Sequence, residues 1–127
     1  MRQRNEDRIM EVFYEFPGRK FTVREIAKIT GIPRASVHKI LRILKEEKMT
    51  KDNMADNSLL FKIKKIDYYL EKIASSGLIE ELAQKLNPSC IILFGSIRKG
   101  DSVKESDIDL FVESPVKKEV KLEKRRI

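Results

Sequence analysis

The segment FTVREIAKITGIPRASVHKILRILKEEK, residues 21–48, decides the fold of the first half of this chain. Thr22 and Glu25 have the spacing of a capping box, so a helix is predicted over Val23 to Ile29, with Ile26, Ala27 and Ile29 buried. That helix ends at Thr30-Gly31, and a further helix is predicted from Arg34 to Lys48. The apolar residues of the later helix repeat at the spacing of one buried helix face: Val37, Ile40, Leu41 and Leu44.

The opposite face of this later helix is basic and polar. It carries Arg34, Ser36, His38, Lys39, Arg42 and Lys45. Two helices joined by a tight turn that contains glycine, the second basic on its outer side, form a helix-turn-helix. In that motif the second helix enters the major groove of DNA, and its N-terminal residues meet the base edges.

The flanking segments extend the motif. A helix is predicted over Asn5 to Tyr14, and a hairpin is predicted from Met49–Lys51 and Ser58–Lys64, with turns at Asp52-Asn53 and Asp56-Asn57 between them. Helix, helix, helix, hairpin is the order of a winged helix, and residues 4–65 resemble that family. The resemblance implies a domain over residues 1–65 that binds double-stranded DNA, as transcriptional regulators do. It places Arg34, Ser36, Lys39 and Arg42 in the groove and Lys62 and Lys64 on the wing.

The charge distribution agrees with a polyanionic partner for the first half alone. Residues 1–65 carry 16 Lys/Arg and 9 Asp/Glu, a net charge of +7, whereas residues 66–127 carry 11 of each. Three alternatives remain open: a solubilising surface, a three-helix bundle with a basic face, and a winged helix that binds protein. His38 is the one histidine of the chain, so we expect a surface residue next to the DNA rather than a metal ligand.

Composition and length indicate a cytoplasmic protein with no membrane association. The 127 residues are 41% hydrophobic, and the longest apolar run, Cys90 to Phe94, is far too short to cross a bilayer. The N-terminus is polar and resembles no targeting segment. The single cysteine, Cys90, cannot form an internal disulfide and is expected to be buried and inert.

Two amphipathic helices are predicted between the halves, over about residues 65–74 and 78–86, and both are expected to serve packing. After them, the five apolar residues Cys90 to Phe94 predict a strand buried on both faces. It ends in Gly95-Ser96, where the absent side chain lets a phosphate approach the backbone, especially if a short helix begins there.

An acidic pair follows ten residues later. Asp107 and Asp109 are separated by one residue, so on a strand both carboxylates project from one face, while Ile108, Leu110 and Val112 bury the other. Such a pair can bind one or two magnesium ions. The glycine-serine turn and the acids are expected to meet at the carboxyl ends of adjacent strands, an arrangement suited to metal-assisted phosphoryl or nucleotidyl transfer.

Residues 77–114 resemble the minimal nucleotidyltransferases of the DNA polymerase beta-like superfamily. The matching motifs are Phe94-Gly95-Ser96, Arg98-Lys99-Gly100 and Ser106 to Leu110. The resemblance implies an α+β chain in which residues 66–127 form a partial nucleotidyltransferase domain. It also implies that Gly95 and Ser96 hold a nucleoside triphosphate, while Asp107 and Asp109 bind Mg²⁺ and are catalytic. Arg98 and Lys99 are expected to be solvated loop residues.

The family has a third carboxylate on a later strand, and no residue of the charged segment 116–127 matches it, Glu119 and Glu123 included. We therefore expect weak nucleotide binding with little transfer by the chain alone, and stabilisation by a second copy or a protein partner. The segment is consistent with a shortened domain or with half of a composite site. A different hypothesis is an active nucleotidyltransferase that modifies a hydroxyl acceptor, as some family antitoxins adenylylate their toxins; a purely structural adaptor is a third.

Overall fold

The computed structural model describes residues 4–117 and 119–123. These residues form six helices and two antiparallel two-stranded sheets, which confirms the α+β class. They divide into two compact units, residues 1–63 with 102–105, and residues 64–101 with 106–127. Lys118 and residues 124–127 of the charged segment, like residues 1–3, lie outside the described part. No helix in the described part is both long and apolar enough to cross a membrane.

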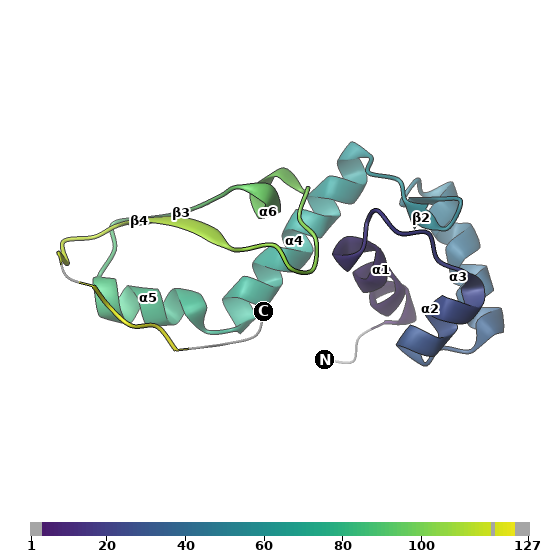
Figure 1. Ribbon diagram of the computed structural model, residues 1–127, viewed down its shortest axis with the longest axis horizontal. Helices are drawn as coiled ribbons and strands as arrows, with labels where there is room; N and C mark the ends of the chain where they lie inside the picture. The colour runs from purple at the N-terminus through teal and green to yellow at the C-terminus, as the bar shows by residue number, and fades with distance from the viewer. Residues whose placement is uncertain (1–3, 118, 124–127) are drawn as a thin grey trace. The chain divides into compact units, whose positions relative to one another are not determined.

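Three helices build the first unit: α1 (Asn5–Glu15), α2 (Val23–Thr30) and α3 (Arg34–Glu46) (Figure 1). All three predicted helices are confirmed within two residues. Their apolar faces enclose a core in which the rings of Phe13 and Phe21 meet edge to face, with centroids 5.8 Å apart. Of the three residues of α2 predicted to be buried, Ile26 is buried and Ala27 is half-buried, but the prediction for Ile29 was wrong, since it is 55% exposed.

The predicted capping box starts α2. The Thr22 hydroxyl accepts from the backbone amide of Glu25 at 3.1 Å, and the Glu25 carboxylate accepts from the amide of Thr22 at 2.9 Å. That amide, and then the Arg19 guanidinium, lower the pKa of the Glu25 carboxyl. Because folding lowers the pKa of Glu25, the ionised carboxylate stabilises the fold at neutral pH. This stabilisation is lost as the pH falls through the lowered pKa.

The wing follows α3 as the hairpin β1 (Thr50–Lys51) and β2 (Met54–Ala55). Asp52 and Asn53 have φ angles of 53° and 58°, as a two-residue hairpin turn requires. The carbonyl of Asn53 accepts from the amide of Phe21 at 2.9 Å, so the wing is joined to the segment before α2. The predicted hairpin therefore exists, but its second strand lies earlier than expected.

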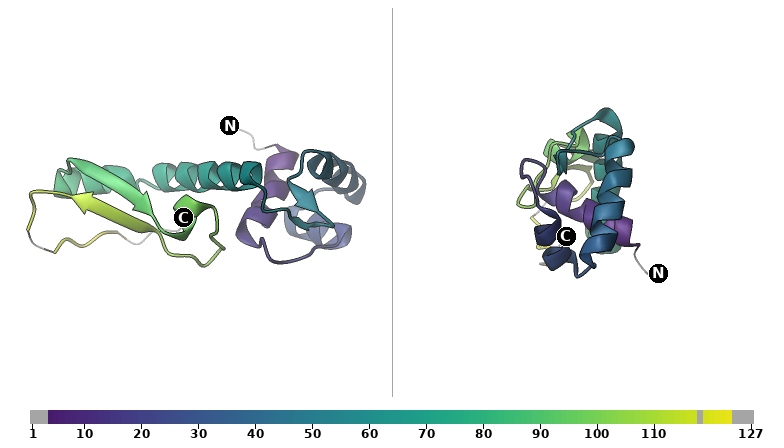
Figure 2. Two further views of the ribbon diagram at one scale, coloured as in Figure 1. Left: turned by 90° about the horizontal axis from the view of Figure 1, so that it is seen from above. Right: turned by 90° about the vertical axis from the view of Figure 1, so that its right-hand side faces the viewer.

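The segment predicted as that second strand, Ser58–Lys64, belongs instead to the helix α4 (Leu59–Ser75). The Ser58 hydroxyl accepts from the amide of Phe61 at 3.2 Å, which is an N-cap interaction. The alternation of Leu59, Phe61 and Ile63 predicted one buried strand face. On the helix only Phe61 is buried, and the other two are mostly exposed. Figure 2 shows α4 as one continuous helix, which absorbs the helix predicted over residues 65–74.

The second unit contains α5 (Leu78–Leu86), β3 (Cys90–Phe94), α6 (Ser96–Lys99) and β4 (Asp109–Glu113). Strands β3 and β4 pair antiparallel, with Phe94 opposite Asp109 and Cys90 opposite Glu113. Ile73, Leu78 and Leu82 form the core, and one face of the hairpin packs on them through Ile91, Leu93, Ile108, Leu110 and Val112. The predicted inward positions Ile108, Leu110 and Val112 are thus confirmed.

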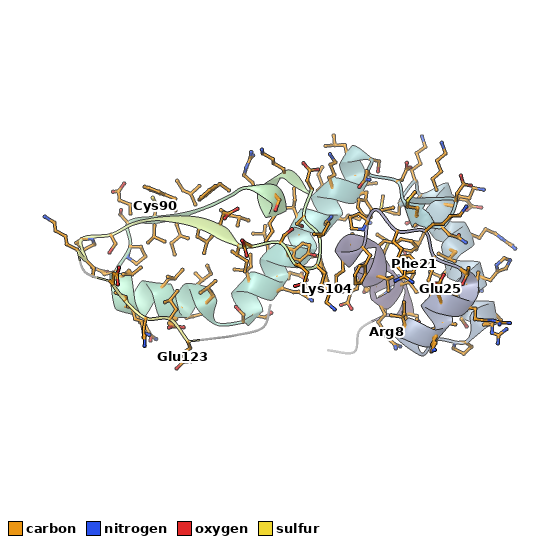
Figure 3. The ribbon with its side chains drawn as sticks, viewed as in Figure 1. Arg8, Phe21, Glu25, Cys90, Lys104 and Glu123 are labelled. Atoms are coloured by element: carbon orange, nitrogen blue, oxygen red, sulfur yellow. The ribbon has the colours of Figure 1, made fainter. Side chains whose placement is uncertain are left out.

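The other face of this hairpin is open, so the prediction that β3 is buried on both faces was wrong. Ile92 and Phe94 are about half exposed on β3, as is Phe111 on β4. Cys90, expected to be buried, is only partly buried, and in Figure 3 it lies on the side of the hairpin turned away from α5. In the described residues α5 covers one face only, which explains why an unbroken apolar run did not mean two buried faces.

The cap of α2 provides a stability test. Replacing Thr22 with Ala leaves the Glu25 amide without its acceptor, and we expect the unfolding free energy to fall by about 1 kcal/mol. Urea denaturation followed by circular dichroism measures this. Thr22→Ser retains the hydroxyl and serves as control; equal stability of the Ala and Ser variants would contradict the role of the cap.

Candidate nucleic-acid interface and nucleotide site

The outer face of α3 presents the residues predicted to contact DNA. Arg34, His38, Lys39 and Arg42 are exposed, and Ser36 is half-buried at the first turn of the helix. The opposite face is held in the core by Val37, Leu41 and Leu44, so packing fixes which residues face outward. Helix α3 therefore offers a rigid basic surface with its N-terminal residues free to meet a ligand.

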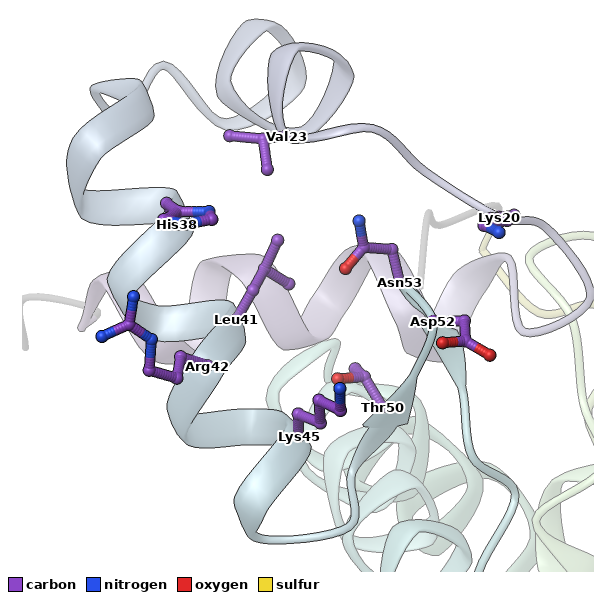
Figure 4. Close-up of a pocket in the computed structure, with 9 residues that line it drawn as sticks. All are labelled: Lys20, Val23, His38, Leu41, Arg42, Lys45, Thr50, Asp52 and Asn53. Atoms are coloured by element: carbon purple, nitrogen blue, oxygen red, sulfur yellow. The ribbon is translucent and has the colours of Figure 1, made fainter.

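A groove of about 430 Å³ lies between α3, the wing and the segment before α2 (Figure 4). Its lining includes four basic side chains and one carboxylate. The residues are Lys20, Val23, His38, Leu41, Arg42, Lys45, Thr50, Asp52 and Asn53. The groove is thus rich in donors of hydrogen bonds to anionic oxygens.

Lys20 was missed as a site residue in the sequence. It lies in a loop with no periodicity, and its place beside the wing follows from the pairing of the next residue, Phe21, with Asn53. The prediction that Lys62 and Lys64 lie on the wing was wrong, because both belong to α4. The lysine that the wing does carry is Lys51, which is exposed at the end of β1 next to the hairpin turn.

In the second unit, the strand β3 leads directly into Gly95 and the short helix α6. Gly95 has φ 81° and ψ −156°, a conformation that is essentially restricted to glycine. A short helix, α6, does begin after the glycine-serine turn, with Ser96 as its first residue. The carbonyl of Ser96 accepts from the amide of Asp101 at 3.0 Å, which closes the turn at the end of α6.

The carboxylate of Asp109 lies directly against Gly95. A β-carbon added to Gly95 would stand 2.2 Å from Oδ2 of Asp109 and 3.1 Å from its carboxyl carbon. The β3–β4 register produces this approach, since Asp109 is opposite Phe94, the residue before Gly95. The glycine-serine turn and one predicted acid thus form a single site.

Two expectations about the acids were wrong. The strands are antiparallel, so the carboxyl end of β3 meets the amino end of β4 rather than another carboxyl end. Asp107 lies in the exposed loop before β4, which begins only at Asp109. Asp107 is only two residues before Asp109, but no strand pairing fixes its position.

Of the two tail acids, Glu119 is exposed and Glu123 lies against α5. Its backbone amide donates to the Glu81 carboxylate at 2.9 Å, and Glu81 also pairs with Lys85 at 2.8 Å on α5. Helix α5 covers the face of the hairpin opposite to Asp109. Among the residues that the structure describes, no group of three or more His, Cys, Asp or Glu side chains is arranged to hold a metal ion.

The three helices with their hairpin have the order of a winged helix-turn-helix, and the second unit brings Gly95 and Asp109 together. Comparison with known families identifies the two parts. The IclR helix-turn-helix domain matches residues 8–51, and the Nucleotidyltransferase domain matches residues 75–127. The chain therefore contains an IclR-type helix-turn-helix domain followed by a nucleotidyltransferase domain. No curated protein and no solved structure matched the chain significantly.

The contact between Gly95 and Asp109 gives a direct test of the site's geometry. Gly95→Ala introduces a side chain into a glycine-only conformation and onto the Asp109 carboxylate, so we expect a loss of about 1–3 kcal/mol in unfolding free energy. Thermal unfolding by calorimetry measures the loss. Gly18→Ala is the matched control, because nothing lies within 4 Å of a β-carbon there. Equal melting temperatures for the two variants would refute the tight approach.

Proposed function

We propose that this chain is a DNA-binding regulator whose winged helix docks α3 in the major groove. The observation that carries the proposal is the basic groove between α3 and the wing, lined by Lys20, Arg42 and Lys45 on its charged sides. A duplex placed against α3 brings its phosphates to this groove. Phosphate contacts of this kind position a protein on DNA, whereas contacts to base edges specify the sequence.

The residues of α3 divide between these two tasks by their position. Arg34, Ser36 and Lys39 lie in the N-terminal half of α3, the part that meets base edges in a helix-turn-helix. Arg42 and Lys45 lie further along and line the groove, so they are assigned to phosphates. His38 lines the same groove and is assigned to the DNA surface, as its exposure allows.

The groove lysines generate a prediction about salt. Lys45→Ala removes one phosphate contact, so affinity for all duplexes should fall and the slope of log K against log salt should decrease by about one unit. Arg34→Ala, by contrast, should change the preference among DNA sequences. Fluorescence anisotropy titrations of the full chain over a salt series measure both effects.

The control is Lys28→Ala, which removes an equal charge from the exposed end of α2, away from the groove. It should leave the salt slope almost unchanged. Equal slopes for the Lys45 variant and the wild-type chain would remove the groove from the interface. An absence of duplex binding at low salt would refute the proposal as a whole.

We propose in addition that the second unit binds a magnesium–nucleoside triphosphate. The supporting observation is the Asp109 carboxylate against Gly95, with Ser96 at the start of α6. Because Gly95 has no side chain, the Asp109 carboxylate can lie against its backbone, and the Ser96 hydroxyl can donate to a phosphate oxygen. Carboxylates and phosphate oxygens are the ligands that Mg²⁺ prefers, so Asp109, with Asp107 from the adjoining loop, would hold it. When bound, the ion neutralises the charge of the phosphates.

Nucleotidyl transfer to a hydroxyl acceptor is the second candidate function. The same residues, Gly95 and Asp109, would hold the magnesium-bound nucleotide for this reaction. In that case the acceptor oxygen attacks the α-phosphate, and pyrophosphate leaves. Ser96 would orient the phosphates, and Asp107 and Asp109 would hold the magnesium ion that neutralises their charge. Pyrophosphate release that requires a defined acceptor distinguishes transfer from nucleotide binding alone.

The nucleotide site is tested by Asp109→Asn, which removes the charge but keeps the shape of the side chain. Magnesium-dependent binding of ATP or GTP, measured by isothermal titration calorimetry, should disappear, because the neutral amide is a much weaker ligand for a hard cation. Glu113→Gln is the control, since this residue lies on the same strand four positions further along. Loss of binding in the control, or unchanged binding in the Asp109 variant, would contradict the assignment.

A further inference from the structure

The outward face of the β3–β4 hairpin joins an apolar patch to the Gly95–Asp109 site. Residues directly opposite each other in an antiparallel pair point to the same face, so Phe94 stands beside Asp109. The next pair on that face is Ile92 with Phe111. Phe94, Ile92 and Phe111 are 48%, 50% and 53% exposed, and we define these three residues as the outer patch.

The outer patch is separate from the core of this unit. The residues that alternate with it along the strands, such as Leu93 and Leu110, pack on the core formed with Leu78 and Leu82. The solvated face of an antiparallel hairpin normally carries polar side chains. Here two phenylalanines and an isoleucine lie next to a carboxylate instead. Apolar side chains gathered beside a polar group on an exposed face are typical of a ligand-binding surface.

The size of the outer patch fits a small aromatic ligand better than a protein. A stable protein interface buries about 800 Å² on each partner and uses roughly 20–30 residues of each. Three half-exposed side chains supply only a fraction of that area, for a second copy of this chain as for any other protein. A single nucleobase, by contrast, is held by stacking on one or two aromatic side chains.

We propose that the outer patch binds the base of the nucleoside triphosphate, which stacks on Phe111. This inference rests on the proposed function, which puts the phosphates and magnesium at Gly95, Ser96 and Asp109. Phe111 is two residues from Asp109 on β4, a distance of about 6.6 Å at ~3.3 Å per residue. The ribose that joins the phosphates to the base spans a distance of this order.

The opposite direction from Asp109 offers no comparable surface. There β3 continues through Gly95 into α6, whose residues Ser96–Lys99 include no aromatic side chain. Arg98 and Lys99 are exposed on this helix and suit phosphates rather than a base. The base is therefore directed over the strands, where the aromatic rings are.

The chemistry of the outer patch also predicts which bases it accepts. Phenylalanine and isoleucine side chains have no hydrogen-bond donor or acceptor with which to distinguish one base edge from another. Stacking on an aromatic ring tolerates every base, because each base has a π-face. Magnesium complexes of ATP, GTP and UTP are therefore expected to bind with affinities within about tenfold of one another.

The test compares nucleotides with magnesium tripolyphosphate, which has the phosphates but no base. Isothermal titration calorimetry of the full chain measures both. Phe111→Ala should weaken the binding of magnesium–ATP by roughly 5- to 150-fold, the effect of losing one stacking contact, and leave tripolyphosphate binding unchanged. Phe111→Tyr keeps the ring and should bind ATP as the wild-type chain does. Unchanged tripolyphosphate binding also shows that the Ala variant retains its fold.

Four results would overturn the proposal. Equal affinity of the wild-type chain for ATP and tripolyphosphate, or unchanged ATP affinity in Phe111→Ala, would exclude the base from the outer patch and leave the phosphate site intact. Equal weakening of both ligands in Phe111→Ala would show that the ring only supports the fold. A dimer in sedimentation velocity that Phe111→Ala dissociates would show that a second copy covers the patch. If neither ligand binds the wild-type chain, the proposed nucleotide site fails together with this inference.

Discussion

The site of the second unit depends on the antiparallel register of β3 and β4. This register sets Asp109 opposite Phe94, and the carboxylate then lies against Gly95 in the space that any other residue would fill. A shift by one residue would turn Asp109 toward α5 and expose the apolar residues that now face it. Packing of the hairpin therefore fixes the position of Asp109 as well as the fold, since the neighbouring pair, Leu93 and Leu110, faces the core of this unit.

The first unit depends on a comparable constraint of backbone pairing. The amide of Phe21 donates to the carbonyl of Asn53, so the segment before α2 and the wing turn stand beside α3. Lys20 and Asn53 thereby join Arg42 and Lys45 around one groove. Neither α3 nor the wing forms this groove alone. The basic face of α3 becomes one wall of a groove only because the wing turn and the segment before α2 are held next to it.

Much of the fold could be predicted from local chemistry. The Thr22–Glu25 capping box and the stripe of α3 are short-range patterns, and their predictions were confirmed. The wing strand was misplaced because Leu59, Phe61 and Ile63 alternate like a strand, whereas the helix predicted over residues 65–74 in fact begins at Leu59 and includes them. The approach of Asp109 to Gly95 was predictable in outline. The strand direction was not, because it depends on packing between distant residues, and the loop position of Asp107 follows from it.

We propose that a metal-bound nucleotide is held by Gly95, Ser96 and Asp109. Paramagnetic relaxation by Mn²⁺ tests it most directly, because the ion broadens the NMR signals of nearby amides in place of Mg²⁺. With ATP or GTP present, we expect substoichiometric Mn²⁺ to broaden the amide signals of Gly95, Ser96 and Asp109 first and to leave those of α3 sharp. Broadening confined to other acidic residues, such as Glu80 on α5 or Glu46 on α3, would show that the metal-bound nucleotide does not bind at Gly95.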